Sequence, residues 1–141
     1  MTDRTKIGAG LLVLPLLLLA AATAAATDLK ITDSRGTEVT VQSAAIDYGG
    51  FMASDKETGG LRVMQGDGFV TVKWTEIETI RVTRVDASEK PPRIELEIVL
   101  KNQKKVPAAL LRQGRMKLTG KTELGDYSID LDKVKTITPI R

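Results

Sequence analysis

Apolar and polar residues alternate along most of the chain after residue 27, as they do in half-buried β-strands. In the segment 93–100, RIELEIVL, the apolar positions are Ile94, Leu96, Ile98 and Leu100. The segment 69–74, FVTVKW, alternates in the same way. No window shows a helical stripe longer than about ten residues, and Gly114 interrupts the best candidate, AALLRQGRMKL. The pattern therefore predicts an all-β protein.

Two segments resemble each other without a gap: GFVTVKWTEIETI at 68–80 and GDYSIDLDKVKTI at 125–137, which are 57 positions apart. Both read as a strand, a short corner and a second strand, and this internal similarity indicates two related halves. The alternation places six matched residues in the core: Trp74, Ile77 and Ile80, and Leu131, Val134 and Ile137. A sugar-stacking role for Trp74 is the less favoured alternative, because its partner in the repeat is a leucine.

Upstream of this repeat the halves share only an order of strand, polar turn and strand, in ITDSRGTEVTV and in VLKNQKKVPA. The first half is longer by about 11 residues, and the difference maps to the glycine-flanked loop 49–60. Phe51 and Met52 lie in this loop without a period-two partner. We interpret them as candidates for contact with a partner, or as a lid over one end of the core.

Pro91 and Pro92 do not suit a central strand, so the segment 87–92 is expected to connect the halves. The sequence thus divides into a first β half at 27–86 and a second at 93–141. One apolar face in each half predicts a small antiparallel sandwich or barrel built from two β-meander halves.

The first 26 residues have the composition of a targeting segment. Arg4 and Lys6 precede twenty uncharged residues, 7–26, which are rich in leucine and end in small residues. This order is typical of a helical signal peptide, with cleavage expected after Ala26. The alternative is an uncleaved membrane anchor, since about 20 apolar residues can span a bilayer. Either interpretation predicts an exported protein, periplasmic or extracellular, in or near the cell envelope.

Composition removes many chemistries from the 141-residue chain, which is 42% hydrophobic and 28% charged. It contains no Cys and no His, which excludes disulfides, thiolate nucleophiles, His-based triads and most transition-metal sites. Carboxylates are the remaining acid–base groups, but Asp126, Asp130 and Asp132 do not follow the spacing of a calcium loop. We predict no catalytic residue, no metal and no cofactor; a carboxylate-dependent hydrolase is the less favoured alternative.

Charge is uneven although the net charge is only +3. The segment 101–121 contains no acid and seven basic residues: Lys101, Lys104, Lys105, Arg112, Arg115, Lys117 and Lys121. Such a run predicts either a solvated rim or a surface for an anionic envelope polymer or lipid headgroups. Export argues against nucleic acid as a partner. The sequence therefore favours a non-catalytic binding or assembly role, with a protein or an anionic polymer as partner, peripheral membrane contact as an option, and oligomers through strand edges.

Overall fold

A computed structural model describes residues 27–49, 56–89, 92–111 and 116–140. Eleven strands account for most of them: β1 (Asp28–Asp33), β2 (Glu38–Asp47), β3 (Lys56–Glu57), β4 (Gly60–Gln65), β5 (Gly68–Lys73), β6 (Ile77–Asp86), β7 (Arg93–Leu100), β8 (Lys105–Leu111), β9 (Lys117–Thr122), β10 (Gly125–Asp130) and β11 (Val134–Ile140). Two 3-10 turns, η2 (Trp74–Glu76) and η3 (Leu131–Lys133), precede β6 and β11. The described residues contain no α-helix, and the prediction of an all-β protein is confirmed.

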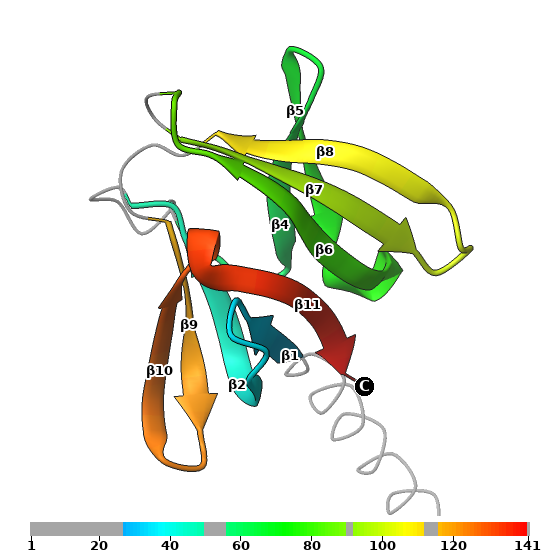
Figure 1. The fold of residues 1–141 in the computed structure, drawn as a ribbon. Helices are drawn as coiled ribbons and strands as arrows, with labels where there is room; N and C mark the ends of the chain where they lie inside the picture. The colour runs from blue at the N-terminus through cyan, green and yellow to red at the C-terminus, as the bar shows by residue number, and fades with distance from the viewer. Residues whose placement is uncertain (1–26, 50–55, 90–91, 112–115, 141) are drawn as a thin grey trace, which may run out of the picture.

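The strands form one curled antiparallel sheet, which resembles half of a barrel (Figure 1). Its order is β10-β9-β2-β1-β11-β6-β7-β8-β4-β5, with β3 paired to β2. The segment 1–26, expected to be a signal peptide or an anchor, lies outside the described residues. Within the described part of the chain, no helix is long and apolar enough to cross a membrane.

The elements recur along the chain at a fixed spacing. The series β4, β5, η2 and the start of β6 has counterparts in β9, β10, η3 and the start of β11, each 57 positions later. The β1–β2 and β7–β8 turns correspond at a spacing of 67, since Gly36 and Gln103 both adopt positive φ, at 88° and 71°. Two hydrogen bonds repeat with the elements: Ser34 N donates to Lys133 O at 2.8 Å, and Lys101 N donates to Glu76 O at 3.0 Å.

The sheet order shows that the two sequence halves exchange strands. One side of the sheet, which we call lobe I, contains β1 and β2 from the first half with β9, β10 and β11 from the second. The other side, lobe II, contains β4, β5 and β6 from the first half with β7 and β8 from the second. Figure 1 shows lobe I below lobe II. Each lobe is therefore complete only when both halves contribute.

The lobes meet where β6 pairs with β11. The register there opposes Ile80 to Ile137, which are equivalent positions of the repeat. The structure thus has an approximate two-fold axis through this pair. Beside it, the Thr79 and Thr138 hydroxyl oxygens lie 2.9 Å apart in a hydrogen bond.

A bulge in β2 lies between the part of the strand that pairs with β1 and the part that pairs mainly with β9. Its register with β9 shifts between Gln42 and Ala45, and Ser43 adopts a φ of 51°. The two amides at the bulge bond to the start of β1: Ser43 N to Asp28 Oδ1 at 3.3 Å, and Ala44 N to Thr27 O at 3.0 Å. Bulges increase local twist, and here the strand pairs with β1 before the bulge and mainly with β9 after it.

Buried residues from both lobes form one hydrophobic cluster. It includes all six residues that the repeat places in the core: Trp74, Ile77, Ile80, Leu131, Val134 and Ile137. The two 3-10 turns, which begin at Trp74 and Leu131, have equivalent hydrogen bonds. Trp74 N donates to Gly59 O at 3.1 Å, and Leu131 N donates to Met116 O at 3.0 Å. Trp74 is 2% exposed, which leaves no surface for sugar stacking.

The shared cluster and the strand exchange predict that the lobes unfold together. Leu131→Ala in lobe I should lower the free energy of unfolding by about 2–5 kcal/mol. Trp74, the single tryptophan of the chain, lies in lobe II, so its fluorescence midpoint in urea should fall together with the circular dichroism midpoint. The control Lys135→Ala changes an exposed residue of β11 and should shift stability by less than about 0.5 kcal/mol. An unchanged Trp74 fluorescence midpoint in Leu131→Ala would show two independent lobes.

Candidate binding pocket beside strand β5

An apolar pocket of about 230 Å³ lies in lobe II between the β4–β5 hairpin and the β7–β8 hairpin. Its wall on the first hairpin and η2 consists of Val63, Gln65, Val70, Thr71, Val72 and Glu76. Its wall on the second hairpin consists of Ile98, Leu100, Val106 and Ala108. Only three of these residues carry polar side chains, Gln65, Thr71 and Glu76, and all three are exposed. The pocket therefore offers an apolar interior with polar groups at its rim.

The seam between β4 and β8 is short. Among the described residues the two strands pair at one position, Met64 with Ala109. The corresponding seam of lobe I, between β9 and β2, begins at the equivalent pair, Lys121 with Gln42, and continues through three more pairs after the bulge. The pocket lies beside this single pair, where the hairpins of lobe II diverge towards their turns.

Strand β5 gives the pocket an accessible side, because it stands at one end of the strand order. Two adjacent large apolar residues on it are exposed: Phe69 by 60% and Val70 by 42%. Val70 contributes to the pocket wall and Phe69 does not. An exposed strand edge with apolar side chains is a surface on which another polypeptide can pair.

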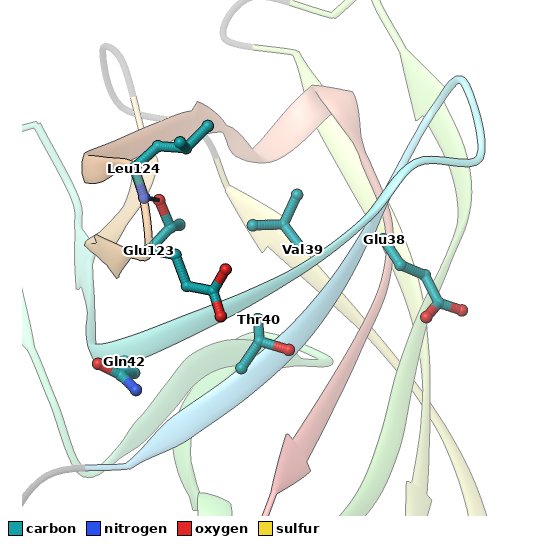
Figure 2. Close-up of a pocket in the computed structure, with 7 residues that line it drawn as sticks. Glu38, Val39, Thr40, Gln42, Glu123 and Leu124 are labelled. Carbon is teal, nitrogen blue, oxygen red and sulfur yellow. Dashed lines mark hydrogen bonds between the residues drawn. The ribbon is translucent and has the colours of Figure 1, made fainter.

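A second hollow, of about 390 Å³, lies in lobe I between β2 and the β9–β10 turn. Its lining is Glu38, Val39, Thr40, Gln42, Thr122, Glu123 and Leu124. Figure 2 shows the Glu123 carboxylate directed towards β2 beside Thr40, while Glu38 points away from it. Leu124 is fully exposed at the turn, where its N–H donates to the Thr122 hydroxyl at 3.2 Å. The hollow is wider and more polar than the pocket of lobe II.

The five described basic residues of the segment 101–121 do not gather in one place. Lys101, Lys104 and Lys105 are exposed at the β7–β8 turn, in lobe II. Lys117 and Lys121 lie on β9, in lobe I, and Figure 1 shows these two regions on opposite sides of the molecule. Lys121 also has an acid nearby, with its Nζ 3.9 Å from Asp126 Oδ1. Arg112 and Arg115 lie outside the described residues.

The remaining candidate groups are the loop residues and the carboxylates. Phe51 and Met52 also lie outside the described residues. On the exposed face of β7, Glu97 pairs with Arg81 at 3.2 Å and Glu95 with Arg84 at 3.8 Å. Within the described ranges, no group of three or more acids is placed to hold a metal ion.

Phe69 and Val70 are the functional candidates that the sequence analysis missed. Alternation in FVTVKW could not show that the space beside Val70 is incompletely filled. The repeat contains that signal, because the position equivalent to Val70 is Tyr127. A large residue in one half and a small one in the other indicates a difference in packing.

The two tyrosines of the chain sit in different settings. The Tyr48 hydroxyl accepts a hydrogen bond from Arg62 N at 2.8 Å, and the Arg62 guanidinium lies 4.8 Å from the centre of its ring. Burial nevertheless raises the pKa of Tyr48. Burial also raises the pKa of Tyr127, and the nearby carboxylate of Asp33 adds to the effect. Tyr127 is half-buried on β10 and packs against the core.

No protein-family model, no curated protein and no solved structure matches this chain.

Both pKa shifts predict a loss of stability at alkaline pH. A raised tyrosine pKa means that folding favours the neutral phenol, so this contribution is complete below about pH 10 and is lost as pH rises through the folded pKa. Spectrophotometric titration should show less tyrosinate in the folded protein than in urea at pH near 10. Tyr48→Phe isolates Tyr127, whose titration midpoint should still lie at higher pH than that of the unfolded chain. Coincident folded and unfolded curves would contradict the burial of both phenols.

Proposed function

We propose that this chain is an exported, non-catalytic β protein that binds a partner polypeptide through the apolar pocket beside β5. The observation that carries the proposal is the coincidence of a pocket with an exposed strand edge that displays Phe69 and Val70. Binding sites are typically concave and apolar, with few polar groups that fix orientation. A strand edge adds backbone groups that a partner strand can pair with.

Export is supported by the composition of residues 1–26, which have a basic start, an apolar centre and small residues at the end. A non-catalytic role is supported by the absence of His and Cys from the sequence and by the arginines that engage Glu95 and Glu97. General acid–base catalysis by paired carboxylates needs groups that share a pocket and have opposed pKa shifts. The lining of the lobe II pocket contains one carboxylate, Glu76.

Site-specific photo-crosslinking in cells that produce the protein tests this proposal. A photoreactive phenylalanine analogue at Phe69 should give a discrete adduct with another protein, identified by mass spectrometry. The control places the analogue at Asp126, which is the equivalent exposed position of β10 in lobe I and should give no such adduct. Equal labelling at both positions, or none at Phe69, would contradict binding at β5.

The same preparation tests export. N-terminal sequencing should find Thr27 as the first residue of protein recovered from the envelope or the medium. An intact N-terminus in the membrane fraction would support the anchored alternative.

A second candidate function is the binding of an anionic envelope polymer or lipid headgroups. It is favoured by three exposed lysines within one turn, Lys101, Lys104 and Lys105. Replacing all three with Gln should abolish retention on anionic vesicles, as should about 0.5 M salt, where the Debye length is only a few Å. Replacing the exposed Lys30, Lys73 and Lys135 with Gln removes the same charge elsewhere. Equal loss in both variants would show that net charge, and not this turn, attracts the vesicles.

A further inference from the structure

The repeat supplies a counterpart of the lobe II pocket in lobe I. The spacing of 57 relates the pocket residues of β4, β5 and η2 to Gly120, Thr122, Tyr127, Ser128, Ile129 and Lys133 in lobe I. The spacing of 67 relates the pocket residues of β7 and β8 to Ile31, Asp33, Val39 and Val41. Strand pairing supports this equivalence, since Met64 with Ala109 corresponds to Lys121 with Gln42. The two sites can therefore be compared residue by residue.

One pair of differences compensates in volume. Lobe I has Gly120 against Val41, whereas lobe II has Val63 against Ala108. A Cβ atom at Gly120 would collide with Val41 Cγ1 and would lie 2.8 Å from Gln42 O. The small residue and the larger one have thus changed places between the lobes.

A second difference does not compensate. Lobe I has Tyr127, whose ring packs against the core and lies near Asp33. Lobe II has Val70 in the place of Tyr127 and Leu100 in the place of Asp33. Valine lacks the phenol ring, and both of these lobe II residues line the 230 Å³ pocket. The pocket therefore lies at the position where the other lobe carries a tyrosine side chain.

We propose that this pocket receives one tyrosine side chain from an extended segment of a partner polypeptide that lies along β5. The inference rests on the proposed function and names the group that is recognised. Tyr127 suggests the shape of the group, because in lobe I its ring is half-buried against the core at the position equivalent to Val70. Gln65 and Glu76 at the rim supply polar partners for a phenol hydroxyl, which needs hydrogen bonds when it is partly buried. The free edge of β5 accounts for a polypeptide carrier.

Titration of the folded protein with p-cresol, the tyrosine side chain as a free molecule, tests the pocket. Methyl resonances of Val63, Val70 and Val106 should shift in a saturable way, while those of Val39 and Val41 should not. The aliphatic analogue 4-methylcyclohexanol is the control for ring shape and should bind more weakly by roughly tenfold. Equal binding of both compounds, or equal shifts in both lobes, would overturn the proposal.

Two variants exchange the properties of the lobes. Val70→Tyr should fill the pocket and weaken p-cresol binding by roughly tenfold or more, without lowering the melting temperature. Tyr127→Val should create a second site, seen as new p-cresol shifts at Val39 and Val41. If Val70→Tyr does not fold, Tyr127→Val still tests the equivalence of the two sites. Failure of a folded Tyr127→Val protein to bind in lobe I would refute the equivalence of the two sites.

The source of the ring is tested with peptides. The blocked peptide Thr-Tyr-Thr should bind more tightly than p-cresol, because its backbone pairs with β5, and Thr-Ala-Thr should not bind. Binding of p-cresol without binding of Thr-Tyr-Thr would refute a polypeptide carrier and indicate a site for small aromatic molecules. A crosslink at Phe69 without p-cresol binding would preserve the proposed function and refute the tyrosine pocket.

Discussion

The pairing of β6 with β11 is the constraint on which the arrangement of the chain depends. Each of these strands is the last of its half and follows a 3-10 turn whose first residue is buried. Opposing Ile80 to Ile137 fixes the approximate two-fold axis. With the axis fixed, β1 pairs with β11 and β7 pairs with β6, so each hairpin is placed beside the closing strand of the other half. The exchange of strands is a consequence of this register.

The strands could be predicted from the sequence because burial on one face leaves a period of two. The segment 93–100 coincides with β7, and the repeat spacing of 57 recurs in the strands and turns. The order of strands could not be predicted, since alternation shows which face a residue occupies but not which strand lies next to it. A half that folds on itself and a half that exchanges strands have the same alternation and the same hairpins.

The candidate sites show the same limit. The basic run allowed either a solvated rim or one binding surface, and the sequence could not show that β8 and β9 belong to different lobes, which separates Lys105 from Lys117. The sequence pattern did not indicate that Phe69 or Val70 belongs to a binding site. Their importance follows from the edge position of β5 and from the comparison with Tyr127, and both require knowledge of which hairpins face each other.

Strand exchange in a single chain has a consequence for specialisation. Two identical halves related by a two-fold axis would form two identical lobes, and any opening in one would be repeated in the other. Because both halves lie in one polypeptide, each position of the repeat is encoded twice and can vary separately. The tyrosine at 127 and the valine at 70 show such divergence. Covalent linkage thus lets one lobe pack a large side chain of its own against the core, while the other lobe carries a smaller residue at the same position and has an apolar pocket beside it.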